Sequence, residues 1–356
     1  MRERSTIGIM LNEDANHFAY SRTAEEMTPE GVDALVDGYA DGTQVSDLLF
    51  NVNAMRSSVA SSVKQAFWDG FDPDAGDDQP FFAHLSAADI KTIRHWVGNL
   101  LLLHQRTIDP YARWLARSRK HGVRGWISIR MNDIHWVEEP GRLMHDRLWR
   151  EHPEYWRERA REFETSIDRA IDYAHPEVRA NYLAYIHECV ARYDMDGIEL
   201  DFMRQPFNFR AGHEEQGAAL MTSLVRECRE LVRGRATTLG RPLRLAVRVP
   251  SKPDTARRLG LDTVTWARER LVDHVTICPI FGTTSFDMPV ELWKQLLAGT
   301  GVTLAAGLEC NVMPFPGATS RFHTSETVYG AVASLLDRGA GRTYLFNFMD
   351  RSYAST

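Results

Sequence analysis

One stretch of the chain decides the fold: Asp196-Gly197-Ile198-Glu199-Leu200-Asp201-Phe202-Met203-Arg204. Side chains alternate between the two faces of a strand, so Ile198, Leu200 and Phe202 share one face, and Glu199 and Asp201 share the other. Two carboxylates on one face of a core strand are costly to bury without partners, because desolvating a charge is expensive. The stretch therefore predicts a buried strand whose end carries acidic side chains into a polar site.

The composition is that of a globular protein with enough apolar material for a large core. The chain has 356 residues, of which 44% are hydrophobic and 25% charged, and this length suits one large α/β domain. The formal net charge of −6 argues against nucleic acid as the main partner, because phosphate binding needs a basic face. No run approaches the ~18 apolar residues of a membrane span, and the N-terminus lacks the apolar core of a signal peptide. We therefore expect a cytoplasmic protein with no nucleic-acid or membrane partner.

The cysteines and histidines indicate neither disulfide bonds nor a zinc site. The four cysteines show no CxxC pairing, which favours buried free thiols in a reducing compartment. Histidines 145, 152 and 175 are scattered, and no HExxH pattern appears. We therefore expect no cofactor and no bound metal ion.

Short β-rich apolar runs alternate with helical patterns along the whole chain. The predicted strands are 6–12, 46–53, 125–132, 197–203, 243–249, 274–280, 303–309 and 343–348. The predicted helices are 29–40, 87–120, 177–193, 214–239, 263–271, 290–297 and 325–337. Proline near the start of the first helix and glycine after the ends of several others agree with known helix start and stop signals.

Eight strands, of which the first seven are each followed by a helix, predict a parallel (β/α)8 TIM barrel that forms a single domain over residues 1–356. A doubly wound open sheet is the alternative, but no GxGxxG motif follows the first strand. Two connections, 55–86 and 133–175, have the length of lids or binding loops. The chain ends shortly after the eighth strand and leaves little room for a full eighth helix. Either another subunit of a homo-oligomer covers that flank, or the chain is short.

Polar side chains gather at one end of the predicted barrel. Active sites of this fold lie at the C-terminal ends of the strands, and the alternation points polar side chains inward there on six strands. The polar residues of these six strands are Asn12, Asn51, Asn53, Arg130, Asn132, Glu199, Asp201, Arg248 and Glu309. The eighth strand adds Asn347, although which face it occupies is ambiguous. A single inward polar residue is usually structural, but convergence from six strands predicts a pocket.

The residue types in this pocket favour a carbohydrate ligand. Amides, arginines and carboxylates together supply the donors and acceptors that a hydroxyl-rich molecule needs. The loop after the third strand offers Asn132 and His135 as partners for sugar hydroxyls and Trp136 as a stacking surface, with Arg204 as a further ligand contact. An alternative interpretation makes Asp133 and His135 loop-capping residues. The sequence shows no serine–histidine pair that would suggest acyl transfer. It also shows no lysine at a strand end that would suggest Schiff-base chemistry.

The sequence at 196–201, DGIELD, resembles the strand-four motif of glycoside hydrolase barrels, both family 18 chitinases and α-amylase-like enzymes. Chitinases carry a glutamate two residues beyond the position of Asp201, and this chain has Met203 there, so we expect no chitinase activity. In amylase-like and α-galactosidase-like barrels the matching aspartate is the nucleophile. In the large clan of β-glycosidases the catalytic carboxylates follow strands four and seven, which implies Asp201 and Glu309. The Asn-Glu pair of that clan is absent, and the overall pattern most resembles family 10 glycosyl hydrolase-like proteins.

We therefore expect a glycosidase in which Asp201 is the nucleophile and Glu309 is the general acid/base, with the two roles open to exchange. Carboxyl groups ~5–5.5 Å apart would imply retention of configuration, and ~6.5–9.5 Å inversion. Glu199 lies one strand period deeper, and we interpret it as a structural partner of Arg130 or Arg248.

Two other functions remain open. One is a metal-dependent (Mg²⁺ or Mn²⁺) isomerase, lyase or hydrolase, since these ions prefer oxygen ligands. Its ligands would be Asp133, His135, Glu199, Asp201 and Glu309. The other is a non-catalytic sugar-binding barrel.

Overall fold

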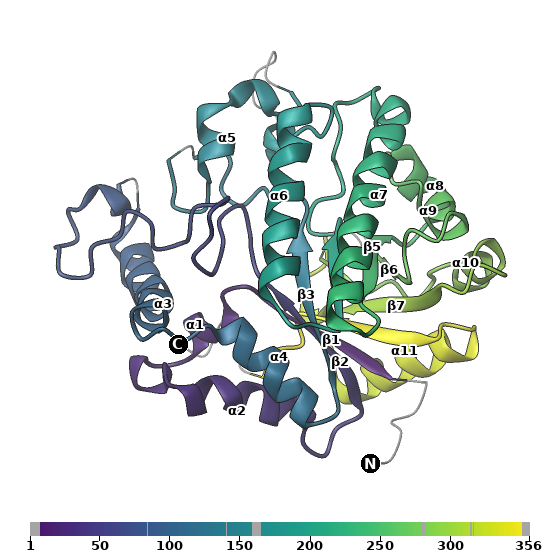
Figure 1. The fold of residues 1–356 in the computed structure, drawn as a ribbon, viewed down its shortest axis with the longest axis horizontal. Coiled ribbons are helices and arrows are strands. Elements are labelled where there is room, and N and C mark those ends of the chain that lie inside the picture. Colours follow the sequence, from purple (N-terminus) through teal and green to yellow (C-terminus); the bar gives the residue numbers. More distant parts are fainter. Residues whose placement is uncertain are drawn as a thin grey trace.

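Eight parallel strands close into a barrel, and helices surround it (Figure 1). The computed structural model describes residues 8–83, 85–139, 141–158, 165–279, 282–313, 315 and 317–350. The barrel strands, in chain order, are β1 Ile9–Glu13, β2 Val45–Asn51, β3 Arg124–Arg130, β4 Gly197–Asp201, β5 Arg244–Pro250, β6 His274–Cys278, β7 Thr303–Glu309 and β10 Arg342–Phe346. Their spatial order is β1-β10-β7-β6-β5-β4-β3-β2. The TIM barrel is confirmed, and the closed sheet excludes the open doubly wound alternative.

Helices connect successive strands on the outside of the barrel. The α-helices are α1 His17–Ser21, α2 Pro29–Ala40, α3 Ala87–Gln105, α4 Pro110–Lys120, α5 Arg147–Glu151, α6 Pro176–Arg192, α7 Glu214–Leu239, α8 Pro253–Arg258, α9 Thr263–Arg268, α10 Val290–Leu296 and α11 Ser325–Asp337. Short 3-10 turns cover Ala24–Glu26, Pro80–Phe82, Pro153–Tyr155 and Ser166–Arg169. An antiparallel ribbon, β8 Asn311–Val312 with β9 Arg321–Phe322, follows β7. Among the described helices, none has the length and apolar character needed to cross a membrane.

The prediction of one helix over 87–120 is wrong, because the chain breaks between α3 and α4. Thr107 has a left-handed backbone with φ of 56°, and Pro110, which has no N–H, begins α4. The side chain of Asp109 caps the new helix by accepting a hydrogen bond from the Ala112 N–H at 3.2 Å. Apolar periodicity continues across this break, so periodicity did not reveal it.

The expected alternation of side chains is confirmed on both faces of the sheet. Outward residues such as Leu48, Phe50 and Val52 belong to the main core between barrel and helices. A separate cluster fills the barrel itself, and it consists of Met10, Leu49, Trp126, Ala246, Ala305, Tyr344 and Phe346. The interior is therefore a packed core whose upper layers, toward the C-terminal strand ends, become polar.

The N-terminal end of the barrel is closed by a buried ion pair. The Asp47 carboxylate accepts two hydrogen bonds from Arg124, at 2.6 and 2.7 Å, and one from Arg342 at 2.9 Å. The Trp126 indole N–H donates to the same carboxylate at 2.9 Å. These partners join β2, β3 and β10, so this end is a structural plug.

The two long connections form one body above the barrel. Arg56, in the loop after β2, donates to the carbonyl of His145, in the loop after β3, at 3.0 Å. Arg56 also donates to the Asp69 carbonyl at 3.2 Å. The described parts of both loops are mostly without regular structure, as expected, and they pack on each other beside the C-terminal strand ends.

The flank of the barrel after β10 carries no further helix within the described chain, which ends at Asp350; residues 351–356 lie outside the description.

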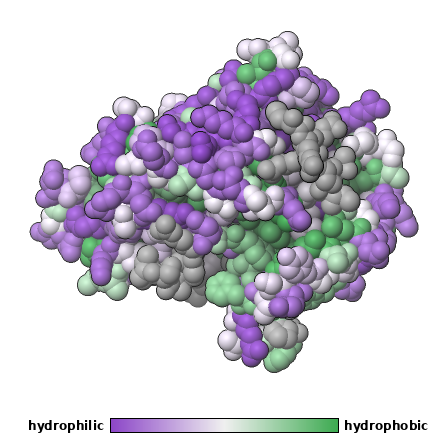
Figure 2. Space-filling view, turned by 90° about the horizontal axis from the view of Figure 1, so that it is seen from below, coloured by the Kyte–Doolittle hydropathy of each residue, from purple (hydrophilic) through white to green (hydrophobic). Residues whose placement is uncertain are grey.

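Seen from below, hydrophilic residues cover the left of the molecule and hydrophobic residues gather right of its centre (Figure 2). The exposed large apolar side chains of the described chain are Phe286, Leu292, Phe315, Phe322 and Tyr329. The prediction that another subunit covers the flank of the barrel after β10 stays a prediction.

Candidate active site

A single guanidinium joins the two predicted catalytic carboxyl groups. Arg248, on β5, donates through Nη1 to both carboxylate oxygens of Asp201, at 3.1 and 3.0 Å. Through Nη2 it donates to Oε1 of Glu309 at 3.3 Å. Asp201 ends β4 and Glu309 ends β7, so tertiary structure brings together side chains from three strands at the C-terminal mouth. All three are buried, with Glu309 the most exposed at 5%.

The surroundings hold Arg248 in place. Its Nε lies 3.2 Å from the Cys278 sulfur, and its guanidinium carbon lies 3.8 Å from the centre of the Phe346 ring. Burial by itself would lower the pKa of Arg248, but Asp201 and other neighbours, including Glu309, raise it well above its ordinary value. The arginine is therefore a permanent positive charge between the carboxyl groups.

The two carboxyl groups differ in what surrounds them. Asp201 also accepts the Met203 N–H at 2.8 Å, and donors on both oxygens suit a charged carboxylate. Burial raises the pKa of Glu309, and the arginines at positions 248 and 204 offset part of this rise. The two carboxyl groups therefore lie in unlike environments: Asp201 accepts three hydrogen bonds, and Glu309 accepts one and is held mainly by burial.

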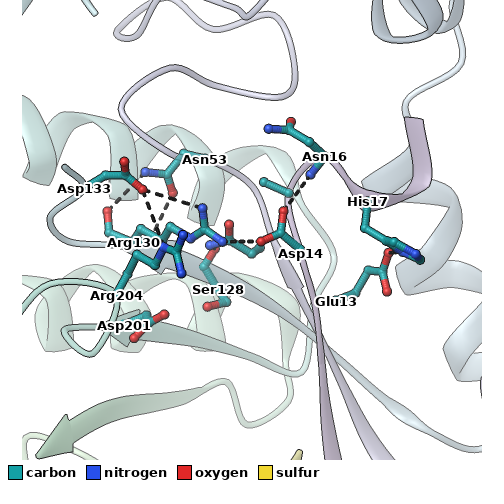
Figure 3. A network of polar contacts seen from close by, with 12 residues as sticks. Glu13, Asp14, Asn16, His17, Asn53, Ser128, Arg130, Asp133, Asp201 and Arg204 are labelled. Carbon is teal, nitrogen blue, oxygen red and sulfur yellow. Dashed lines mark hydrogen bonds and ion pairs between the residues drawn. The ribbon is translucent and has the colours of Figure 1, made fainter. Parts of the chain in front are cut away.

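A second network of charges lies beside this pair at the ends of β1 and β3 (Figure 3). Arg130 forms ion pairs with Asp14 and, at 3.6 Å, with Asp133. Burial would raise the pKa of Asp14, but Arg130 and Arg204 lower it to about 2. The network is therefore ionised at neutral pH.

His135 is the most solvent-accessible member of this network. Its Nδ1 donates to Asp133 at 2.7 Å, and 33% of its side chain is exposed. Its Nε2 accepts from Arg204, whose own Nε lies 4.0 Å from Asp133. The imidazole is therefore held in one orientation at the rim, where a ligand can reach it.

Glu199 lies deeper in the barrel and is not the arginine partner we expected. Its Oε1 accepts hydrogen bonds from Ser128 Oγ at 2.8 Å and from the Tyr344 hydroxyl at 2.9 Å. Burial, with a smaller contribution from Asp201, raises the pKa of Glu199 to about 7. Among the described contacts no hydrogen bond or ion pair joins Glu199 to Arg130 or Arg248, which bind carboxylates nearer the mouth; Arg248 acts on Glu199 through its charge, which offsets part of the rise in pKa.

Three residues predicted to contact the ligand already have partners within the protein. The Asn53 amide donates to the Arg130 carbonyl and accepts its N–H, both at 3.1 Å. Asn132 donates to the carbonyls of residues 171 and 207 at 3.0 and 3.2 Å. Trp136 has a left-handed backbone, and the guanidinium of Arg142 lies 4.8 Å from its ring. These three residues shape the walls around the mouth.

Two other predicted residues carry buried polar atoms without a partner. Within the described chain, neither amide atom of Asn12 makes a hydrogen bond, and Oδ1 of Asn347 makes none. Asn347 follows β10 with φ of 61°, which removes it from the strand alternation. Since buried polar groups are normally satisfied, both residues have hydrogen-bonding capacity left at the mouth.

Our predictions missed three polar residues that the structure places here. Asp14 follows Asn12 with the same parity, so extending the first strand by two residues would have found it. Ser128 shares the parity of Arg130, and Tyr344 lies inside the eighth strand, whose parity we left open.

The metal-dependent reading has no matching geometry in the described chain. Among those residues, the group of three potential ligands close enough to share an ion consists of Asp37, Asp41 and His121. This group lies on the outer helical layer, where Arg117 already binds Asp37 at 2.6 Å. The five residues predicted as ligands at the mouth do not form such a group.

Comparison with solved structures shows which proteins share this fold. No family model and no curated protein sequence matches this chain. The PgaB (BpsB) glycoside hydrolase domain from Bordetella bronchiseptica is similar in structure, with a TM-score of 0.57, 10% identity and coverage of 95% of this chain and 93% of that chain. The catalytic domain of psychrophilic chitinase B from Arthrobacter TAD20 has a TM-score of 0.51, 12% identity and coverage of 96% and 91%.

An inactive mutant of the GH20 exo β-N-acetylglucosaminidase from Vibrio harveyi has a TM-score of 0.51 and 10% identity, and 96% of this chain covers 50% of that chain. At these identities the similarity establishes the TIM-barrel fold that these proteins share; a specific likeness to family 10 is not among these findings.

Proposed function

We propose that this protein is a glycoside hydrolase whose active site is the mouth around Asp201 and Glu309. The observation that supports this function is the shared guanidinium of Arg248, which holds carboxyl groups from β4 and β7 near each other. Two carboxyl groups in unlike environments are what glycosidic bond cleavage requires.

In this proposal Glu309 protonates the glycosidic oxygen while Asp201 attacks the anomeric carbon or stabilises its positive charge. Water then attacks, and Glu309 takes the proton from it. A sugar ring between the carboxyl groups has to replace the contact from Arg248 to Glu309, which at 3.3 Å is longer than the contacts to Asp201. His135 and Arg204 remain at the rim to contact the substrate.

The test is hydrolysis of a panel of α- and β-aryl glycosides over a range of pH. Asp201→Asn and Glu309→Gln should each lower kcat/KM by about 10²- to 10⁴-fold for whichever glycoside is cleaved. The matched control is Asp33→Asn, since Asp33 also pairs with an arginine, Arg113, but on the outer helices; it should leave the rate unchanged. Full activity in both mouth variants would refute the assignment.

A non-catalytic sugar-binding barrel is the second candidate, and the ion pairs themselves favour it. Asp201 and Glu309 are both buried on Arg248, and carboxyl groups held in this way also suit a rigid binding site. This candidate predicts no hydrolysis on any glycoside and oligosaccharide affinity that survives in both mouth variants.

A further inference from the structure

A polar cavity of about 320 Å³ lies where residues of the two long loops meet α6. Its walls include Ser62 and Lys64 from the loop after β2, Asp146 and His152 around α5, and Asn181 from α6. Its volume is at the lower end of the range of about 300–1,000 Å³ that small-molecule sites occupy. None of the predicted catalytic or substrate-binding residues lines it.

A buried, charged lysine forms part of this wall. Only 1% of the Lys64 side chain is exposed, and its Nζ donates to Asp146 at 3.2 Å and lies 4.4 Å from the centre of the Tyr182 ring. Burial by itself would lower the pKa of Lys64, but Tyr182 and Asp146 raise it above its ordinary value. Lys64 lines the cavity, and since an ammonium group has three N–H donors, it keeps hydrogen-bonding capacity beyond its contact to Asp146.

Asn181 adds an unused acceptor to the same wall. Its Oδ1 is buried and has no hydrogen-bond partner among the described residues. Leaving a buried amide oxygen unpaired costs about 1–3 kcal/mol, so the fold gains no stability from it. A ligand hydroxyl in the cavity would satisfy it.

One hydrogen bond links the loop beside the cavity to the loop that carries His135. His145, which precedes Asp146 in the chain, contacts the carbonyl of His135 through Nε2 at 3.0 Å. Asp133, the partner of His135, also acts on the charge of Lys64. The loop residues around His135 and the cavity are therefore linked, and an oligosaccharide that extends past His135 is the ligand we test there.

We propose that this cavity is a second carbohydrate-binding site, which holds a neutral pyranose unit of an oligosaccharide. Its lining holds both positive and negative side chains together with neutral polar ones, so it favours a neutral ligand with many hydroxyl groups over an ion. Lys64 donates to the sugar and Asn181 accepts from it. The inference rests on the proposed function only for the expectation that the ligand is a carbohydrate.

The test is isothermal titration of the full chain carrying Glu309→Gln with three probes: N-acetylchitohexaose, cellohexaose and maltohexaose. In that background, Asn181→Ala should weaken binding of the recognised hexasaccharide at least about tenfold. The control, His187→Ala, changes an exposed residue of the same helix and should leave the affinity unchanged. The melting temperature of Asn181→Ala should stay the same or rise, because an unsatisfied amide is removed.

Saturable binding that is equal in Asn181→Ala and its parent would overturn the inference, and so would the absence of saturable binding to all three probes. Hydrolysis of aryl glycosides, which are too short to fill both sites, is measured separately. Hydrolysis without hexasaccharide binding in the cavity refutes only the second site. Cavity binding without hydrolysis refutes only the enzymatic function.

Discussion

The three carboxyl groups at the mouth differ in their hydrogen-bond partners and in the shift of their pKa. Asp201 receives donors on both oxygens, Glu309 receives one, and Glu199 receives two neutral donors on a single oxygen. Only the two groups nearer the mouth touch a cation. Burial therefore raises the pKa of both glutamates, that of Glu199 to about 7, while arginines offset part of the rise at Glu309.

Glu199→Gln should remove a pH dependence of stability. The pKa of Glu199 is about 7 in the folded protein and 4.5 ordinarily, so between these values the folded state holds a proton that the unfolded state has released. Stability falls as pH rises through this window, by about 3 kcal/mol in total. Glutamine mimics the neutral acid and should abolish the fall.

Urea unfolding at about pH 5 and about pH 8 measures this difference. Glu215→Gln, on the exposed face of α7, should keep the wild-type dependence. If Glu199→Gln also keeps it, then the buried acid does not titrate in this range.

At the scale of elements, a close contact between β3 and β4 fixes how these two strands pack in the barrel. Gly197 pairs with Trp126 in the register of β3 and β4. A Cβ atom at position 197 would lie 2.1 Å from the indole ring, so only glycine fits beside it. This contact sets the depth at which β4 begins and hence where Asp201 ends it.

A pair of glycine-to-alanine variants should separate packing from helix propensity. Gly197→Ala should lower the free energy of unfolding by about 1–3 kcal/mol or more, since the ring cannot move without disturbing the barrel core. Gly234→Ala, in the exposed interior of α7 with no atom within 4 Å of the added Cβ, should raise it by about 0.5–1 kcal/mol. Denaturant midpoints of the two variants check both signs; equal effects would mean that Trp126 does not constrain position 197.

At the scale of the whole molecule, the ion pairs around Asp47 join β2 to β3 and to β10 and so stabilise the closed barrel. The arginine partners of Asp47 lie 77 and 295 residues away in the chain. Burial would raise the pKa of Asp47, but hydrogen bonds and charge from Arg124 lower it below its ordinary value of 3.8. The ion pairs are therefore intact at neutral pH.

Asp47→Asn should lower the free energy of unfolding by about 3 kcal/mol at neutral pH, because it leaves two arginines without their shared anion. The folded pKa lies below the unfolded one, so this contribution is full above about pH 4 and disappears as the pH falls through the folded value. Wild type and variant should therefore converge in acid. Asp33→Asn, at a half-exposed surface pair, should cost less than about 1 kcal/mol; an equal cost would mean that the plug does not close the barrel.

The sequence by itself determined the strands, the inward side of each strand and the end at which polar residues collect, because these depend on local periodicity and on the known rules of parallel barrels. It could not determine the partners. Arg248 joins Asp201 to Glu309, and Asp14 rather than Glu199 binds Arg130, because a side chain selects among charges that only the closed barrel brings within reach. The cavity at Lys64 also belongs to tertiary structure, since segments remote in the chain line it. The break before Pro110, by contrast, is local, because the proline and its Asp109 cap start a new helix.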